Sequence, residues 1–143
     1  MSKIKVLFIC TDNSARSQMA EAFLRKYGGA DFEAYSAGTE PKGIHPYAER
    51  VMEEVGISLS SHYSKHLKEY MGKIHFSYVI ILCEEAEKQC PTTFPGIVQR
   101  LHWSFEDPST MVGSDDEKLM KFREVRDKIE EHIKDWSVKK KAV

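Results

Sequence analysis

The sequence predicts a single-domain α/β fold in which a parallel four-stranded sheet is flanked by helices. Four short segments typical of strands alternate along the chain with segments of helical periodicity, and no internal repeat or low-complexity linker divides them. Strands that alternate with helices form parallel sheets through right-handed crossovers. The chain has 143 residues, of which 41% are hydrophobic, which suits one core and one domain over residues 1–143.

The expected strands are short β-rich runs. Residues 3–10 contain Val-Leu-Phe-Ile, and residues 77–83 contain Tyr-Val-Ile-Ile-Leu. Both are continuous apolar runs, the pattern of strands that are buried on both faces of a parallel sheet. Residues 32–37 and 100–103 are the two further strands that complete the expected sheet.

The expected helices carry apolar residues at helical spacing and end at ordinary stop signals. Residues 17–27 form the first helix, residues 46–56 the second, and residues 116–136 the last. Residues 60–73 are expected to form a loop that leads into a short helix near Leu67. The last five residues, 139–143, are expected to fray as a tail.

Charge and composition exclude several classes of function. The 21 Lys and Arg against 22 Asp and Glu leave a formal net charge of −1, so there is no basic field for nucleic acid. The first apolar run is only about six residues, shorter than a signal-peptide core, and no stretch approaches the roughly 20 apolar residues of a membrane span. Three cysteines without a secretory signal indicate a reducing compartment. We expect a cytoplasmic monomer.

The segment that joins the first strand to the first helix carries the chemistry. Backbone N–H groups at a helix N-terminus, the helix dipole and the guanidinium of Arg16 together favour a tetrahedral oxyanion. The same field favours a thiolate, so we expect Cys10 to be the nucleophile, with a pKa of about 3.5–7.5 instead of about 8.5. The spacing of Cys10 and Arg16 alone would also fit a buried structural cysteine and an unrelated surface arginine. That alternative does not explain why the two residues lie where a strand is followed by a helix. The expected oxyanion-binding loop comprises Thr11, Asp12, Asn13, Ser14, Ala15, Arg16 and Ser17.

Two residues of this loop have further expected roles. Asn13 tolerates left-handed backbone geometry better than most residues, and its amide can tie the loop together. Ser17 can donate a hydrogen bond to the sulfur of Cys10. The carboxyl ends of the strands also bring Cys83 and Asp107 to the same edge of the sheet, where α/β proteins bind their ligands.

The loop continues into Gln-Met-Ala-Glu, and Ser-Ala-Gly-Thr at 36–39 and Phe-Glu-Asp-Pro at 105–108 follow it. With these motifs in this order, the chain resembles the low-molecular-weight tyrosine phosphatase superfamily and, within it, the thioredoxin-coupled arsenate reductases. The resemblance covers nearly the whole chain. Family loops usually carry Gly where this chain has Asp12, whose carboxylate would oppose an anion unless it points outward. They often carry a second Cys where it has Ala15.

The resemblance implies a relay of three thiols. Cys10 would attack arsenate, and Cys83 would then attack Cys10, releasing arsenite and leaving a Cys10–Cys83 disulfide. Cys90 would resolve that disulfide, and thioredoxin would reduce the exposed Cys83–Cys90 pair. The relay requires residues 84–89 to move, and their charged composition favours exposure.

The resemblance also leaves two other functions open. A low-molecular-weight tyrosine phosphatase would need only Cys10, Arg16 as the oxyanion clamp, and Asp107 as the acid. Tyrosine phosphatases of the superfamily usually carry tyrosines after the Asp-Pro dipeptide, whereas this chain has Ser109 and Thr110. That difference favours an enzyme of arsenic resistance. The third possibility is a non-catalytic oxyanion-binding or redox-sensing module.

No metal or cofactor is expected. The six histidines show no metal-ligand spacing with a carboxylate or cysteine partner. In some arsenate reductases a monovalent cation lies beneath the loop, and the resemblance places Asn13, Glu21 and Ser36 at ligand positions. Lys65 stands near the position where an acidic ligand would be expected, so we do not predict a bound cation.

Overall fold

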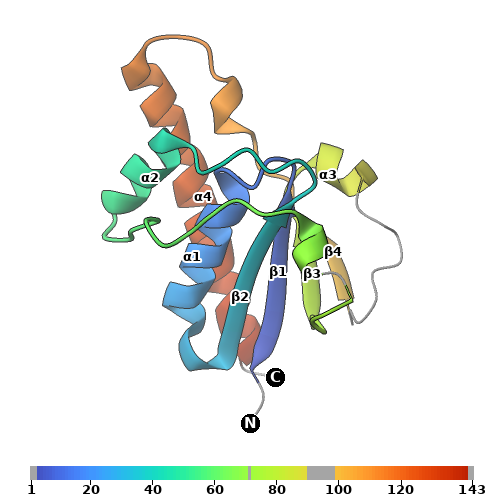
Figure 1. The fold of residues 1–143 in the computed structure, drawn as a ribbon. Coiled ribbons are helices and arrows are strands. Elements are labelled where there is room, and N and C mark those ends of the chain that lie inside the picture. The colour runs from blue at the N-terminus through green and yellow to red at the C-terminus, as the bar shows by residue number, and fades with distance from the viewer. Residues whose placement is uncertain (1–2, 71, 90–98, 142–143) are drawn as a thin grey trace.

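A four-stranded parallel sheet forms the centre of the structure, as the sequence predicts. The computed structural model describes residues 3–70, 72–89 and 99–141 (Figure 1). The strand order is β2-β1-β3-β4, and every neighbouring pair is parallel. The strands are β1 (Ile4–Cys10), β2 (Phe32–Gly38), β3 (Tyr78–Ile81) and β4 (Gln99–His102).

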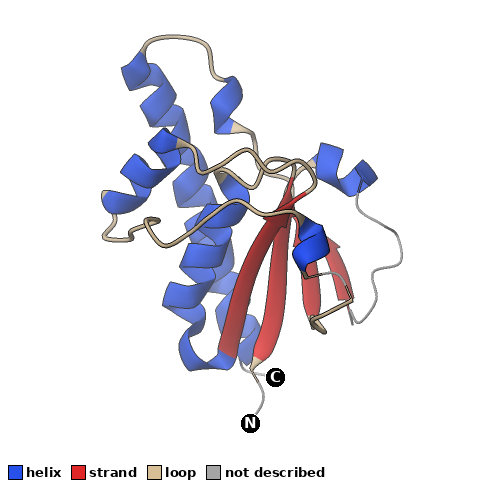
Figure 2. Cartoon of the chain, in the orientation of Figure 1, coloured by secondary structure: helices blue, strands red, loops and turns tan. Residues whose placement is uncertain are grey.

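Helices flank this sheet (Figure 2). The α-helices of the described residues are α1 (Arg16–Gly28), α2 (Pro46–Glu53), α3 (Glu84–Gln89) and α4 (Asp115–Lys141). Helices α1 and α4 lie side by side (Figure 1) and bury their apolar stripes in one cluster with β1. On the opposite face, Leu67 and Ala86 pack in a second cluster. The short helix expected near Leu67 is a 3-10 turn, Leu67–Glu69.

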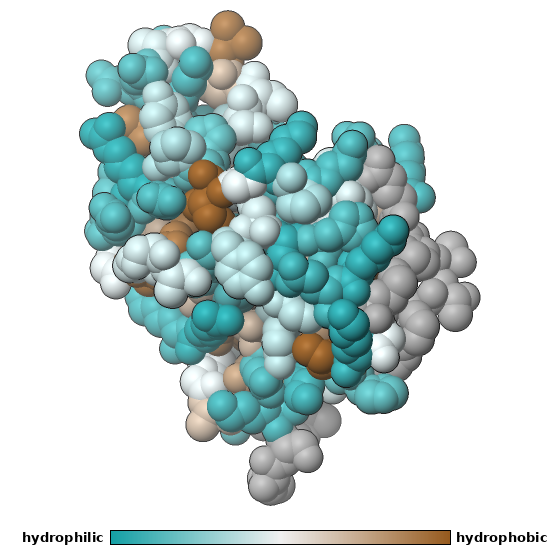
Figure 3. Space-filling view, in the orientation of Figure 1, coloured by the Kyte–Doolittle hydropathy of each residue, from teal (hydrophilic) through white to brown (hydrophobic). Residues whose placement is uncertain are grey.

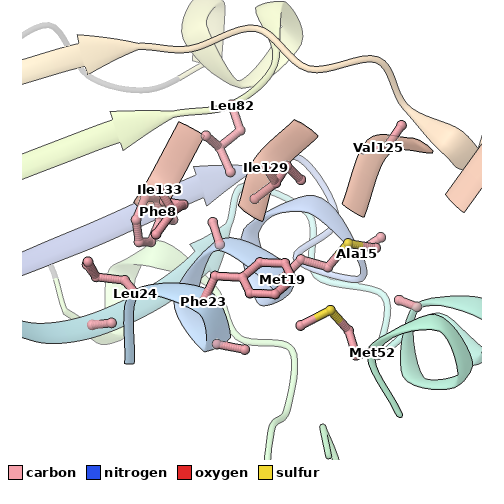
Figure 4. Packing of buried hydrophobic residues seen from close by; sticks show 14 of the residues in the cluster. Phe8, Ala15, Met19, Phe23, Leu24, Met52, Leu82, Val125, Ile129 and Ile133 are labelled. Carbon is pink, nitrogen blue, oxygen red and sulfur yellow. The ribbon is translucent and has the colours of Figure 1, made fainter. Parts of the chain in front are cut away.

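Strand β1 is fixed by a core on each of its faces. Because successive side chains of a strand point to opposite sides, Val6 and Phe8 enter the larger cluster, while Leu7 and Ile9 enter the smaller one. All four side chains are fully buried. Figure 4 shows the larger cluster, to which β1, α1 and α4 each contribute. Burial of each such side chain contributes about 1.5–3 kcal/mol, so the position of Cys10 at the end of β1 is firmly held.

Several boundaries differ from the sequence prediction. Helix α2, expected over residues 46–56, ends at Glu53. Strand β3 ends at Ile81, and residues 84–89, for which the sequence indicates only exposure, form helix α3 around the buried Ala86. Helix α4 continues to Lys141, so a frayed tail is wrong for residues 139–141. The physical reason is that lysine is a good helix former and is favoured by the dipole in a last helical turn.

The surface in Figure 3 is mostly hydrophilic, and its apolar side chains form small separate patches. Among the residues that the structure describes, no helix is long and apolar enough to cross a membrane.

Candidate active site

The predicted site residues meet at the carboxyl edge of the sheet. Cys10 is the last residue of β1, Arg16 is the first residue of α1, and Cys83 lies just beyond β3. Asp107 precedes the 3-10 turn Pro108–Thr110. Cys10 and Cys83 are free thiols in the same buried cluster. Cys90, the remaining predicted site residue, lies outside the described residues.

Ser17 directs its hydroxyl group at the nucleophile, as predicted. The Sγ of Cys10 lies 2.9 Å from the Oγ of Ser17, and that Oγ accepts a hydrogen bond of 2.7 Å from the Nδ2 of Asn13. Because the Asn13 amide donates to the Ser17 oxygen, the Ser17 hydroxyl keeps its own proton available for the sulfur. Ser17 is therefore placed to donate to Cys10 when the sulfur is ionised, which lowers the pKa of Cys10.

The expected low pKa of Cys10 is wrong for this conformation. The residue is only 1% exposed, and burial raises the pKa of its thiol above the ordinary value. The hydrogen bond from Ser17 and the charge of Arg16 lower the pKa of Cys10 but do not outweigh burial. Sequence locates the helix end and the arginine, but it does not reveal how completely the sulfur is enclosed.

Asn13 adopts the left-handed backbone conformation that the sequence predicts, with a φ of 50°. The residue is fully buried, and both the nitrogen and the oxygen of its side-chain amide form hydrogen bonds. Its Nδ2 donates to Ser17, and its Oδ1 accepts a hydrogen bond of 3.0 Å from the backbone N–H of Lys65. The side chain of Asn13 thus ties the loop to the segment that follows β2 and α2.

The sequence analysis missed a second segment, residues 38–45, which supports the loop along its length. Backbone N–H groups of Glu40, Lys42 and His45 donate to the carbonyl oxygens of Thr11, Asp12 and Ser14 at 2.7, 3.0 and 2.9 Å. In a trans peptide the N–H points opposite to the C=O. The N–H groups that follow these three carbonyls therefore point away from residues 38–45, as an oxyanion-binding loop requires.

Gly38 explains why the supporting segment can lie so close to the loop. A Cβ atom at this position would come within 2.6 Å of the carbonyl oxygen of Thr11. A side chain there would force the two segments apart. The Ser-Ala-Gly-Thr motif at 36–39 was the available signal for this contact, but the motif alone does not say what the glycine approaches.

Arg16 is held in place by two contacts on the far side of the loop. Its side chain is 9% exposed, and Nη1 donates to the carbonyl oxygen of Phe105 at 3.0 Å while Nη2 lies 3.5 Å from Oδ2 of Asp107. The other carboxylate oxygen of Asp107 accepts from the N–H and hydroxyl of Ser109 at 2.9 and 2.7 Å. Arg16 and the predicted acid are therefore adjacent and oriented.

A polar pocket of about 320 Å³ opens over these residues. Cys83, only 7% exposed, lies at its edge with its Sγ 3.4 Å from the Oγ1 of Thr11. Asp12 is also among the residues that line the pocket. The pocket is lined by Thr11, Asp12, Arg16, Lys42, Cys83, Glu85 and Asp107.

The polar residues behind the loop, which include Glu21, Ser36 and Lys65, do not fit a bound cation. Lys65 is only 6% exposed and donates through Nζ to the carbonyl oxygen of Tyr63 at 2.7 Å. Burial lowers the pKa of Lys65, while the nearby Glu21 raises it. The carboxylate of Glu21 already accepts a hydrogen bond of 2.7 Å from the hydroxyl of Ser36 and forms an ion pair of 2.9 Å with Arg25. Within the described part of the chain, no cluster of His, Cys, Asp or Glu suits a metal ion.

Comparison with known proteins agrees with this geometry. Residues 5–143 match the family described as low molecular weight phosphotyrosine protein phosphatase. The chain is 44% identical to an arsenate reductase of Oceanobacillus iheyensis, with 94% of this chain and 95% of that protein covered. It is 39% identical to an arsenate reductase of Bacillus subtilis, with coverages of 92% and 94%.

Solved structures give the same result. An arsenate reductase in the oxidised state is 32% identical and superposes with a TM-score of 0.79 over 94% of this chain and 97% of that one. A thioredoxin-dependent arsenate reductase of Corynebacterium glutamicum is 30% identical, with a TM-score of 0.73 over 99% of this chain and 64% of that one. The chain therefore belongs to the low molecular weight phosphotyrosine protein phosphatase family, and the four relatives described above are arsenate reductases.

Proposed function

We propose that this protein is an arsenate reductase that thioredoxin regenerates. One observation carries the proposal: Cys83 is a free thiol at the edge of the oxyanion pocket, in contact with Thr11 of the loop. Phosphatase chemistry needs one sulfur, whereas reduction of arsenate needs a second sulfur beside the first. The arsenate reductases among the relatives support the proposal, and one of them is thioredoxin-dependent.

In the first step, Cys10 attacks the arsenic atom of an arsenate bound by the loop N–H groups and Arg16. Since burial holds Cys10 as a thiol, its proton passes to an oxygen of the arsenate dianion, and the thiolate then forms the S–As bond. The arsenic–oxygen bond breaks, and Asp107 protonates the departing oxygen so that it leaves as water. Asp107 is near Arg16 and open to solvent, which allows its reprotonation.

In the second step, the sulfur of Cys83 attacks the sulfur of Cys10, and the proton of the Cys83 thiol passes to an oxygen of the departing arsenite. The S–S bond forms as the S–As bond breaks, and the electron pair of that bond stays on arsenic. Arsenic is thereby reduced from the +5 to the +3 state and leaves as arsenite, while the two sulfurs are oxidised to a disulfide. The hydroxyl of Thr11 is placed to stabilise the attacking sulfur of Cys83.

In the third step, Cys90 attacks Cys83 and releases Cys10 as a thiol. A dithiol of thioredoxin then supplies the two electrons that reduce the Cys83–Cys90 disulfide. The exposed side chains of Glu84, Glu85 and Lys88 support access of a protein reductant to this segment. The proposal includes a monomer, and it includes a cytoplasmic location because the thiols must be kept reduced.

The test compares two reactions in the same variants. Arsenite release is measured with a thioredoxin system, and hydrolysis of an aryl phosphate is measured without it. Cys10→Ser is expected to abolish both reactions, and Cys83→Ser is expected to abolish only arsenite release. Arsenate reduction that continues at the native rate in Cys83→Ser would contradict the relay.

A phosphatase is the second candidate, because Cys10, Arg16 and Asp107 suffice for phosphoryl transfer. It predicts rapid aryl phosphate hydrolysis and no arsenite release. A non-catalytic oxyanion or redox module predicts that neither reaction occurs, even though sulfate or phosphate still binds.

A further inference from the structure

A chain of buried hydrogen bonds connects the nucleophile to a side chain that the reaction itself does not use. Gln18 is fully buried one residue beyond Ser17. Its Nε2 donates to the backbone carbonyl oxygens of Asn13 and Tyr63, each at 3.0 Å. Its Oε1 lies 3.0 Å from the Nδ1 of His62, which is 44 positions away in sequence.

The orientation of the Gln18 amide follows from its partners. Two carbonyl oxygens can only accept, so the NH₂ group of Gln18 must face Asn13 and Tyr63. The amide oxygen then faces the ring of His62, which must donate from Nδ1. The carboxylate of Glu21, 3.4 Å from the same Nδ1, also requires a donor there. The tautomer of His62 and the amide of Gln18 therefore determine each other.

The bond from Gln18 acts on the residue of the loop that has unusual backbone geometry. Asn13 has a φ of 50°, a left-handed backbone conformation that residues other than glycine adopt only occasionally, Asn more readily than most. Its carbonyl oxygen is held by Gln18 and also by the hydroxyl of Ser64 at 2.6 Å. With the backbone of Asn13 fixed, its Nδ2 donates to the Oγ of Ser17, which lies 2.9 Å from the Sγ of Cys10.

We propose that Gln18, oriented by His62, is a positioning residue that aims the hydroxyl of Ser17 at the sulfur of Cys10. Neither Gln18 nor His62 is among the residues that line the pocket. They act through Asn13, by hydrogen bonds that are buried except for the partly buried one between Gln18 and His62. The proposal rests on the proposed function only in taking Cys10 as the nucleophile.

The mechanism predicts an effect on the thiol rather than on the fold alone. The Ser17 hydrogen bond lowers the pKa of Cys10, so its loss leaves the thiol still harder to ionise. A rise of about one pKa unit lowers the thiolate fraction about tenfold at neutral pH and leaves it unchanged above the new pKa. A purely structural defect would instead lower the rate at every pH.

Protonation of His62 is not expected to disturb the chain. Burial lowers the pKa of His62, and the nearby charges are Glu21, which raises it, and Arg25 and Lys65, which lower it. A further proton on the ring would enter at Nε2 and leave the Nδ1–H in place. The pH dependence that the test measures therefore belongs to Cys10.

The experiment is alkylation of Cys10 by iodoacetamide across a range of pH, followed by mass spectrometry of the peptide that contains Cys10. Gln18→Met keeps the length of the side chain and removes both hydrogen-bonding groups. We expect it to raise the pKa of Cys10 by about one unit and to slow alkylation about tenfold at pH 7, with recovery at high pH. The same change at the exposed Gln99, Gln99→Met, is the matched control and should leave the profile unchanged.

A second pair of variants tests the part played by His62. His62→Asn keeps an N–H donor near the position of Nδ1 and is expected to retain the native profile, whereas His62→Leu should reproduce the shift of Gln18→Met. An unchanged pKa of Cys10 in a folded Gln18→Met or His62→Leu protein overturns the proposal, as does slowing that persists at high pH. Because alkylation needs neither arsenate nor thioredoxin, a failed proposed function and a failed positioning role give different results.

Discussion

Cys10 and Cys83 are both buried thiols at the ends of neighbouring parallel strands, yet their surroundings differ. Cys10 lies within a network of side-chain hydrogen bonds that includes Ser17 and Asn13. Among the described residues, the side chain of Cys83 forms one long hydrogen bond, of 3.4 Å, with the hydroxyl of Thr11. The helix that follows Cys83 exposes its charged side chains, and Ala86 is its buried anchor.

This difference matches the tasks proposed for the two sulfurs. The first must meet the oxyanion in one fixed geometry, because displacement at arsenic is in line and a small misplacement costs rate. The second must reach first Cys10 and then Cys90, so a rigid network around it would oppose the reaction. The comparison therefore predicts that variants around Cys10 act on binding and the first step, and that variants around Cys83 act on later steps.

The largest effect is expected at Arg16. Arg16→Lys keeps the charge but loses the fork that contacts Phe105 and Asp107. We expect the rate of arsenate reduction to fall about 10²–10³-fold, the usual cost of losing one oxyanion donor. Steady-state kinetics measure it, and Arg123→Lys, at an exposed ion pair with Glu54, is the control. Equal activities of Arg16→Lys and Arg123→Lys would contradict a role of Arg16 in binding the oxyanion.

The next effect concerns the fold of the loop. Asn13→Ala loses two buried hydrogen bonds and must place a side chain at a φ of 50°, so we expect a loss of about 2–4 kcal/mol in the free energy of unfolding. Asn13→Gly loses the same bonds but adopts the backbone angle freely, and it should recover about 1 kcal/mol. Urea denaturation measures both values. A glycine variant less stable than the alanine variant would show that backbone geometry does not matter here.

A smaller effect is expected at Thr11, which follows Cys10 in the chain and contacts the sulfur of Cys83. Thr11→Val removes the hydroxyl next to Cys83 and should slow release of arsenite about tenfold, by leaving the attacking sulfur without its partner. Thr11→Ser keeps the hydroxyl and is the control. Single-turnover measurements separate arsenite release from aryl phosphate hydrolysis. If both reactions slow equally in Thr11→Val, the hydroxyl serves the first sulfur instead of the second.

The smallest effect lies away from both sulfurs, at Glu54. Arg123 and Arg126 lower the pKa of this carboxyl from 4.5 to about 2, so its stabilising contribution is complete above pH 4.5 and is lost as the pH falls towards 2. Because Glu54 is one third exposed, we expect Glu54→Gln to cost less than about 1 kcal/mol at pH 7. Thermal unfolding between pH 2 and 7 should give a flatter curve for Glu54→Gln. If the unfolding temperature of Glu54→Gln falls with pH as steeply as that of the native protein, other groups cause the acid unfolding.

The sequence alone determined the local parts of the site. An apolar run, a polar loop and a helix placed Cys10, Asn13, Arg16 and Ser17 correctly, because these residues lie within one strand-loop-helix unit. The rule that parallel strands present their carboxyl ends at one edge also brought Cys83 to the site. Such relations depend on spacing and backbone geometry, which a sequence shows directly.

Only the tertiary structure decided what surrounds that unit. Residues 38–45 support the loop, and His62 meets Gln18, through contacts between distant segments that no local pattern encodes. The raised pKa of Cys10 has the same origin, since burial depends on both layers that pack against β1. The sequence therefore determined which groups carry the chemistry, while packing decided how they are held and how readily Cys10 ionises.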